Sequence, residues 1–272
     1  MGWHHLESQL KRGSKTDPPR VIPFVTVGFP DVETTLELVP ALVQSGAVAV
    51  ELGVPFSDPL AEGPTIQKSS FHALTQGVTL SDCLEVAAEL RRRGTHVPLV
   101  LMGYYNPFLA YGLETVAESA QKVGVDGFIV PDLPVEEIGP MLEACHRHDI
   151  ALIPLLAPTS TDERIKEACT SGQGFIYCVS LLGVTGARVE PSPEAASLVQ
   201  RVRQNTSLPL ALGFGISRKE QIDALASSVD AVVVGSALVD IIANAAPDER
   251  VSKAKEFMEG LGATSQMTGG TH

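Results

Sequence analysis

Eight short apolar runs, spread along the whole chain, limit the fold more than any other feature. They occupy Val21 to Val27, Ala47 to Leu52, Val97 to Met102, Gly127 to Val130, Ile150 to Leu156, Phe175 to Val179, Leu208 to Leu212 and Ala231 to Val234. The runs show little alternation of polar and apolar residues, which is typical of strands covered on both faces in a parallel sheet. Between them lie segments with apolar residues at helical spacing, such as Val32, Leu36, Val39 and Val43.

Eight strand–helix units favour a closed (β/α)8 barrel, also called a TIM barrel, within the α/β class. The alternative is an open doubly wound sheet, which usually has fewer strands and a switch in strand order. We expect an extra N-terminal helix carrying Leu6 and Leu10, and an added helix from Leu80 to Arg92 after the second strand. Residues 1–262 would form one catalytic barrel domain. Residues 263–272, rich in Gly, Ser and Thr, would form a flexible C-terminal tail.

The charge and composition of the chain exclude several classes of function. The formal net charge is −12, which disfavours nucleic acid and anionic membranes as partners, since binding phosphates needs clustered Lys and Arg. The one basic run, Arg91 to Arg93, ends a predicted helix and is expected to be solvated. No apolar stretch is long enough for a membrane span, and no signal peptide is evident, so we expect a cytoplasmic protein. The four cysteines are far apart and are expected to be reduced.

The second apolar run contains a carboxylate, Glu51, close to its carboxyl end. Burial of a carboxylate raises its pKa towards the range in which it exchanges protons near neutral pH. The stiff loop that follows, with three prolines, adds Asp58 and Glu62 at the same end of the barrel. Paired carboxylates there suit acid–base chemistry. The structural alternatives are a Glu51 satisfied by a basic or backbone partner, and turn or helix-start roles for Asp58 and Glu62.

Glycine-bearing turns follow the sixth, seventh and eighth strands, at Gly183 to Gly186, Gly213 to Gly215 and Val234 to Ser236. Many barrels bind phosphate at such turns, because small residues let backbone N–H groups and a helix N-terminus face the anion. Gly215 and Ser236 would be the central donors. The alternative is that these are ordinary strand-end turns and that Ser236 is an N-cap.

The loop after the sixth strand, Ser180 to Pro191, is the best candidate for a closing lid, with Thr185 as a hydrogen-bond donor to a carboxylate. The alternative is a flexible loop with incidental polar residues. His146 and His148 lie two apart on a predicted helix, so they face different directions and do not indicate a metal site. No dinucleotide fingerprint or P-loop occurs, so nucleotide cofactors are not supported.

These segments resemble the tryptophan synthase alpha subunit family across almost the whole chain. The matching motifs are Pro23 to Asp31, Glu51 to Gln67, Pro131 to Glu137, Ser180 to Gly186 and Gly213 to Ser217, of which the run ELGVPFSDPLAEGPTIQ at Glu51 to Gln67 is the most specific. The resemblance implies a carbon–carbon lyase that splits indole-3-glycerol phosphate into indole and D-glyceraldehyde 3-phosphate, a late step of L-tryptophan biosynthesis. It also implies a beta-subunit partner in an alpha-beta-beta-alpha tetramer. Pyridoxal phosphate would be held by that partner, with no cofactor or metal in this chain.

The resemblance assigns roles to individual residues. Glu51 would be the general acid and base, Glu62 the carboxylate that holds the indole N–H, and Tyr177 a neighbour of the reacting carbons. The implied phosphate donors are Gly186, Gly215, Gly235 and Ser236, the implied indole walls are Phe24, Met102, Tyr104, Ile129 and Phe214, and the implied partner contacts are Pro55 and Asp58.

One position departs from the family pattern. The family usually has Asp where this chain has Glu62, whose side chain reaches about 1.5 Å further. An error of that size can be costly in an active site. Three alternatives therefore stay open: a weakly active subunit that mainly activates its partner, a stand-alone indole-3-glycerol phosphate lyase, and a different phosphosugar isomerase or decarboxylase on the same barrel.

Overall fold

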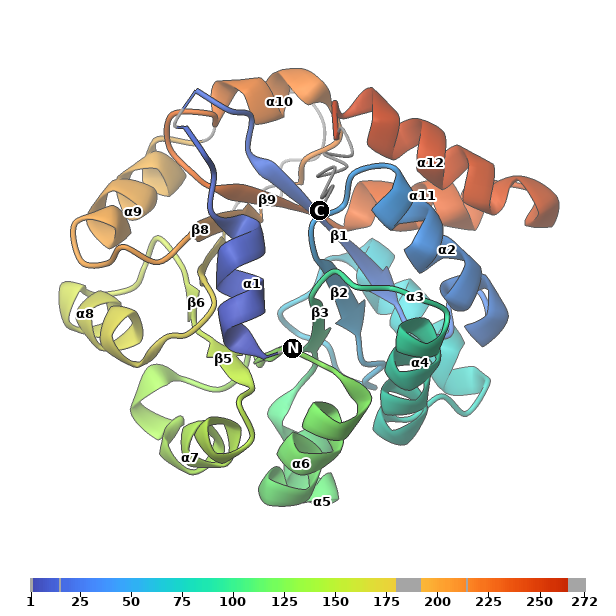
Figure 1. Ribbon diagram of the computed structural model, residues 1–272, viewed down its shortest axis with the longest axis horizontal. Coiled ribbons are helices and arrows are strands. Elements are labelled where there is room, and N and C mark those ends of the chain that lie inside the picture. The colour runs from blue at the N-terminus through green and yellow to red at the C-terminus, as the bar shows by residue number, and fades with distance from the viewer. Residues whose placement is uncertain (1, 15, 180–191, 214, 264–272) are drawn as a thin grey trace, which may run out of the picture.

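The computed structural model describes residues 2–14, 16–179, 192–213 and 215–263 of the 272. Parallel strands form a ring that helices surround (Figure 1). The strands are β1 (Arg20–Thr26), β2 (Val50–Gly53), β3 (Leu99–Met102), β4 (Gly127–Ile129), β5 (Ala151–Ile153), β6 (Leu155–Leu156), β7 (Ile176–Val179), β8 (Leu210–Gly213) and β9 (Ala231–Val234). The predicted C-terminal tail lies almost entirely outside the described residues.

The strand order shows that the ring is closed. Hydrogen bonding runs β5-β4-β3-β2-β1-β9-β8-β7-β6, and only Pro154 separates the two ends of this series in the chain. β5 pairs with β4 and β6 pairs with β7, so β5 and β6 are the two halves of one barrel strand. Proline lacks the N–H that a ladder needs, which explains the break within the predicted strand. The predicted (β/α)8 barrel is confirmed.

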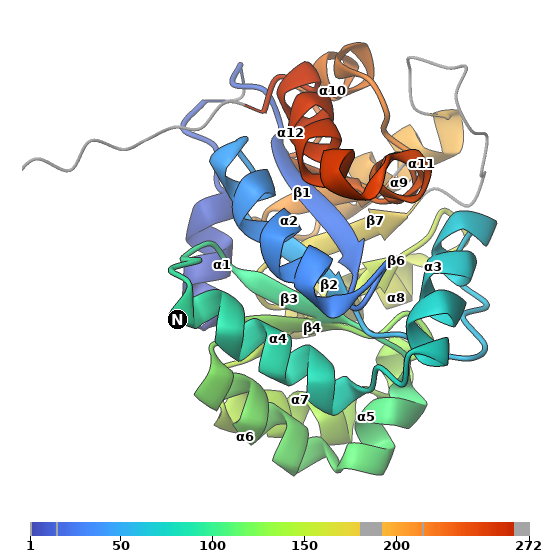
Figure 2. The ribbon, with the colours of Figure 1, turned by 90° about the vertical axis from the view of Figure 1, so that its right-hand side faces the viewer.

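Helices follow the strands around the outside, and α2, α4 and α6 lie side by side there (Figure 2). They are α1 (Trp3–Leu10), α2 (Val32–Gln44), α3 (Pro64–Thr75), α4 (Leu80–Arg92), α5 (Tyr105–Tyr111), α6 (Leu113–Val123), α7 (Gly139–Arg147), α8 (Asp162–Ser171), α9 (Pro193–Arg203), α10 (Lys219–Ala224), α11 (Ser236–Asn244) and α12 (Arg250–Gly260). Both added helices are present, α1 before the first strand and α4 at the predicted bounds. A capping box between Thr79 and Asp82 satisfies the first N–H groups of α4 and so sets its start.

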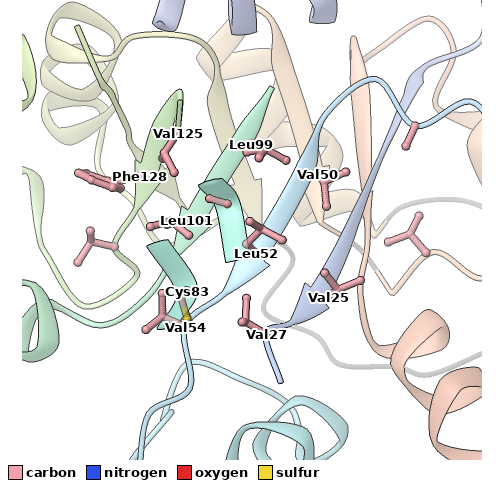
Figure 3. Packing of buried hydrophobic residues seen from close by; sticks show 14 of the residues in the cluster. Val25, Val27, Val50, Leu52, Val54, Cys83, Leu99, Leu101, Val125 and Phe128 are labelled. Atoms are coloured by element: carbon pink, nitrogen blue, oxygen red, sulfur yellow. The ribbon is translucent and has the colours of Figure 1, made fainter. Parts of the chain in front are cut away.

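The strands alternate between two apolar environments. Outward side chains pack under the helices; those in Figure 3 include Val25, Val50, Leu52, Leu99, Leu101 and Phe128. Inward side chains fill the barrel, among them Ile22, Phe24, Val100, Ile129, Ile153 and Phe175. Because both faces are buried, the sequence shows continuous apolar runs without visible alternation. Glu51 is placed inward by this alternation, since Val50 and Leu52 both face outward.

Helix α1 lies across one end of the barrel (Figure 1). Its Leu6 and Leu10 are fully buried and belong to the interior cluster. Leu6 lies so close to Gly174, before β7, that a Cβ there would come within 2.7 Å of Leu6 Cδ2. The amino ends of the strands are therefore closed by α1. The loops at the carboxyl ends, which carry the candidate site residues, are at the other end of the barrel.

Arg91 corrects the expectation that the whole basic run is solvated. Its guanidinium donates to the carbonyl oxygens of Gly124, Thr95 and Val97, and forms a 2.7 Å ion pair with the fully buried Asp126. Asp126 also accepts a hydrogen bond from the Leu99 N–H. Arg91 thus ties the end of α4 to the starts of β3 and β4, whereas the Arg92 side chain is 76% exposed.

We expect Arg91→Ala to be strongly destabilising. The substitution leaves the Asp126 carboxylate buried without its cation, which typically costs about 3–5 kcal/mol. Urea unfolding of the purified chain measures this loss. The matched control Arg92→Ala should leave the unfolding midpoint nearly unchanged. Equal effects of the two substitutions would show that the ion pair between Arg91 and Asp126 does not stabilise the fold.

Within the part of the chain that the structure describes, every helix is too short or too polar to span a lipid bilayer.

Candidate active site

The Glu51 side chain lies inside the barrel, on strand β2. In the strand register it lies between Phe24 of β1 and Val100 of β3. It is fully buried, and among the described residues neither carboxyl oxygen has a hydrogen-bond partner. Burial, with a further contribution from the charge of Glu62, raises the pKa of Glu51 well above its usual range. The structural alternative, a Glu51 locked to a basic or backbone group, is not what the described residues show.

The loop between β2 and α3 carries Glu62 and is fixed at both ends. Near its start, the Phe56 N–H donates to Ser70 Oγ at 2.8 Å, and Ser70 Oγ donates back to the Phe56 carbonyl at 3.0 Å. Near its end, the Glu62 N–H donates to the Pro59 carbonyl at 3.0 Å, and Gln67 Nε2 donates to the Glu62 carbonyl at 2.9 Å. Burial raises the pKa of Glu62 to about 7. Its carboxyl group can therefore lose and regain a proton near neutral pH.

Tyr177 of β7 is the third titratable side chain of the candidate site, with Glu51 and Glu62. Its pKa is raised well above the usual range by burial first and then by the charges of Glu51 and Glu62. The three side chains therefore influence one another across the same space. Gly213 of β8 leaves room for the phenol, because a Cβ there would come within 2.6 Å of the Tyr177 hydroxyl. The structure thus brings together the three predicted catalytic side chains.

Apolar side chains surround Glu51 and Tyr177 in the barrel interior. Of the predicted walls, Phe24 (6% exposed) and Ile129 (fully buried) belong to the interior cluster, and the partly buried Met102 packs against it. Gly53 allows the Phe24 ring to lie against β2, since a Cβ at Gly53 would come within 2.4 Å of Phe24 Cζ. Such apolar walls exclude water from the buried carboxyl group of Glu51. Phe214 lies outside the described residues.

Two of the three predicted phosphate turns lie at least partly within the described residues. Gly235 is the N-cap residue of α11 and, among the described residues, gives that helix no side-chain cap, so the N–H groups of its first turn could bind an anion. Ser236 is the first helical residue and not the N-cap. Gly215 adopts a φ of +63°, and among the described residues a Cβ built there meets no atom within 4 Å. Gly186 and Thr185 lie outside the described residues, as does the lid candidate, 180–191.

The predicted partner contacts differ in exposure. Asp58 is exposed on the loop before α3, whereas Pro55 is buried and presents little surface to another chain. Leu60, two residues beyond Asp58, is 89% exposed. The outer end of this loop is therefore better suited to a partner contact than its start.

A cavity of about 360 Å³ lies beside the site, between the segment after β4 and helix α8. Its lining includes Asp132, Leu133, Leu155, Leu156 and Arg164, and no predicted catalytic or phosphate-binding residue. Its walls also include Glu136, which forms an ion pair with Arg164, whereas the buried carboxyl group of Glu51 lies in the barrel interior and has no partner among the described residues. Within the described ranges, no group of three or more His, Cys, Asp or Glu is arranged to hold a metal ion.

One contact in the site was missed by sequence reasoning. Tyr104, predicted as an indole wall, lies against the β2–α3 loop: its ring stacks on Phe56 and its hydroxyl accepts a hydrogen bond from the Ala61 N–H. Because 43 residues separate Tyr104 from Ala61, no local pattern signals their contact.

Comparison with known proteins identifies the family. A family model described as tryptophan synthase alpha chain matches residues 10–267. A tryptophan synthase alpha chain from Chloroflexus aggregans is 48% identical over 241 residues, which cover 89% of this chain and 90% of that protein. The chain belongs to the tryptophan synthase alpha chain family.

Solved structures of the tryptophan synthase alpha chain family share the fold. The subunit from Legionella pneumophila superposes with a TM-score of 0.86 at 32% identity, covering 96% of this chain and 97% of that one. A chain from the tryptophan synthase α2β2 complex of Pyrococcus furiosus, from a study of mutual activation, gives a TM-score of 0.85 at 39% identity, with coverages of 92% and 100%. The family resemblance read from the motifs is therefore confirmed, and so is an enzyme-subunit role.

Proposed function

We propose that this chain cleaves indole-3-glycerol phosphate by a retro-aldol reaction, releasing indole and D-glyceraldehyde 3-phosphate. This is the known reaction of the tryptophan synthase alpha chain family, to which the chain belongs. The observation that carries the proposal is Glu51, a fully buried carboxyl group without a partner among the described residues, close to Glu62 and Tyr177. An unpartnered buried acid is costly to the fold, and proton transfer to a substrate accounts for its presence.

The chemistry uses the two carboxyl groups in different protonation states. Glu51, whose pKa burial raises well above its usual range, gives its proton to indole C3. The bond between C3 and the glycerol carbon then breaks, and its electron pair restores the aromatic ring. The glycerol hydroxyl loses its proton to Glu51, which leaves an aldehyde and regenerates the acid. Ionised Glu62 holds the indole N–H and stabilises the positive charge that the ring carries after protonation.

The phosphate end of the substrate would bind opposite the carboxyl groups. The backbone N–H groups at Gly215, Gly235 and Ser236 would hold it, with the N-terminus of α11 supplying a positive field. Gly186 and a closing contact from Thr185 remain proposals of the same kind. Anchoring the anion fixes the indole ring against Phe24 and Ile129, and so holds C3 near Glu51.

The relatives also suggest a partner. The similar Pyrococcus furiosus structure is that of an α2β2 complex whose subunits activate each other. We expect this chain to assemble with a beta chain in an α-β-β-α tetramer, with Asp58 and the exposed end of the β2–α3 loop at the contact. Pyridoxal phosphate would be bound in the beta chain, and no step proposed for this chain requires a cofactor.

A direct assay tests the proposal. The purified chain is incubated with indole-3-glycerol phosphate, alone and with a tryptophan synthase beta chain, and both products are measured. We expect equal amounts of indole and glyceraldehyde 3-phosphate, formed faster with the beta chain. High activity that the beta chain does not change would indicate a stand-alone lyase. Activity in neither condition would contradict the proposed reaction.

The two raised pKa values predict a bell-shaped pH dependence of kcat/KM. Glu62 must be ionised, and burial places its pKa at about 7, so the rate should rise as the pH passes through about 7. Glu51 must be protonated, so the rate should fall at a higher pH where Glu51 ionises. Measurement of kcat/KM between about pH 5 and pH 10 tests both limbs. An acid limb at the ordinary pKa of glutamate would exclude the assigned role of Glu62, and Glu62→Gln should remove the limb near pH 7.

A further inference from the structure

Tyr104 connects the third strand of the barrel to the loop that carries Glu62. Its hydroxyl accepts a hydrogen bond from the Ala61 N–H at 2.8 Å, directly before Glu62 in the chain. Its ring stacks on Phe56 with 5.0 Å between ring centroids and an interplanar angle of 20°. Only 6% of the Tyr104 surface is exposed. One side chain therefore contacts the loop near both of its ends.

The backbone around Tyr104 is itself firmly held. The N–H of Gly103 donates to the Ile129 carbonyl of β4 at 3.0 Å, and the N–H of Tyr105 donates to Asp132 Oδ1 at 2.9 Å. Tyr104 thus projects from a segment that is tied to the barrel on the side of β4. A rigid support of this kind can define the position of a loop that packs against it.

The β2–α3 loop needs such a support. Between Phe56 and Ala61 its residues are mostly exposed, and Leu60 is 89% exposed. The bonds that hold the Glu62 backbone, from Pro59 and Gln67, come from the loop and from α3. Among the described residues, the hydrogen bond to the Tyr104 hydroxyl ties this end of the loop to the segment that follows the neighbouring strand β3.

We propose that Tyr104 is a positioning residue for cleavage: by holding the Ala61 N–H and the Phe56 ring, it sets where the Glu62 carboxylate meets the indole N–H. This inference rests on the proposed function. Glutamate has a longer side chain with more rotatable bonds than aspartate, so the place of its carboxylate depends strongly on how its backbone is fixed. An error of about 1 Å at such a group can cost a large factor in rate.

The charged and titratable neighbours fit this role. Glu51 and Tyr177 face Glu62 from β2 and β7, while Asp132 lies near Tyr104 on the side of β4. Burial, with the charges of Glu62 and Asp132 adding to it, raises the pKa of Tyr104 to about 12. The hydroxyl therefore keeps its proton at neutral pH and does not exchange it with substrate during turnover.

Tyr104→Phe tests the proposal while keeping the ring that stacks on Phe56. We expect kcat to fall by about tenfold with KM changed by less than about twofold, since the hydrogen bond fixes geometry and not substrate affinity. Tyr105→Phe, next in the chain, is the matched control and should leave kcat unchanged. If Tyr104→Phe has the kcat of the wild type, the proposal is wrong.

Coupling to Glu62 separates positioning from general damage to the fold. In a Glu62→Gln background the correctly placed carboxylate is already lost, so adding Tyr104→Phe should lower kcat by less than about twofold further. If the double variant instead loses the full product of the two single effects, Tyr104 does not act through Glu62.

A ligand-free measurement keeps this inference distinct from the proposed function. NMR titration of 13C-labelled Glu62 in the unliganded chain should give a midpoint near 7 in the wild type. In Tyr104→Phe the loosened loop admits water, so the midpoint should move towards the ordinary value for glutamate. An unchanged midpoint would overturn the positioning role even if the chain cleaves indole-3-glycerol phosphate. A chain that fails to cleave it but shows the shift would refute the function and retain the loop support.

Discussion

Glu51→Gln should abolish cleavage of indole-3-glycerol phosphate, lowering kcat by about 10³-fold or more, which matches the loss of a general acid that also serves as the base. Glutamine has the shape of glutamic acid but carries no proton that it can give to indole C3. Substrate binding should survive, because the phosphate and ring contacts lie elsewhere. Measurement of single-turnover indole release together with calorimetric binding of the substrate separates the two effects.

The same substitution should also change how stability depends on pH. The folded-state pKa of Glu51 is raised by burial, so the folded chain binds a proton more tightly than the unfolded chain does. The contribution of Glu51 to the free energy of unfolding therefore falls as the pH rises above the ordinary pKa of glutamate. Thermal unfolding of Glu51→Gln should be less sensitive to alkaline pH than that of the wild type.

The kinetic prediction for Glu51→Gln has a clear contradicting outcome. If this variant cleaves indole-3-glycerol phosphate at the wild-type rate, another group transfers the proton.

Ser236→Asp is expected to have the second-largest effect, with opposite signs for binding and stability. A carboxylate in the first turn of α11 complements the helix dipole, so the fold should be as stable as the wild type or slightly more stable. The same carboxylate repels the substrate phosphate, and at about 4 Å this repulsion lowers kcat/KM on the order of 10²-fold or more. Kinetics and thermal unfolding of the same preparation measure both.

The control for this prediction is Ser236→Ala. It removes the hydroxyl and keeps the backbone N–H groups that would hold the phosphate, so its kcat/KM should stay within about tenfold of the wild type, the cost of one hydrogen bond. If Ser236→Asp binds substrate as well as Ser236→Ala does, the phosphate does not lie at the N-terminus of α11.

Much of the fold could be predicted from local sequence. Strands buried on both faces appear as apolar runs, and helices as stripes, so the eight units and the bounds of α4 were visible. The strand break at Pro154 follows from the missing N–H of proline. It was not predicted, because the apolar run from Ile150 to Leu156 has the pattern of one continuous strand. Glu51, in contrast, was conspicuous in the sequence because it is the one carboxylate within the eight apolar runs.

What could not be predicted depends on contacts between distant parts of the chain. Arg91 looked like a solvated helix end, but it is partly buried and its ion pair with Asp126, 35 residues later, depends on the tertiary fold. Pro55 was assigned to the partner contact by resemblance but is buried. Tyr104 was assigned to the indole wall by resemblance, while its hydrogen bond to Ala61 depends on the tertiary fold.

The central claim is that Glu51 keeps its proton inside the barrel at the pH at which the chain works. NMR titration of 13C-labelled Glu51 in the unliganded chain tests it most directly, with Glu51→Gln used to assign the signal. We expect a carboxyl group that remains protonated at neutral pH and ionises well above the ordinary range of glutamate. A Glu51 that ionises at the ordinary pKa of glutamate would contradict it.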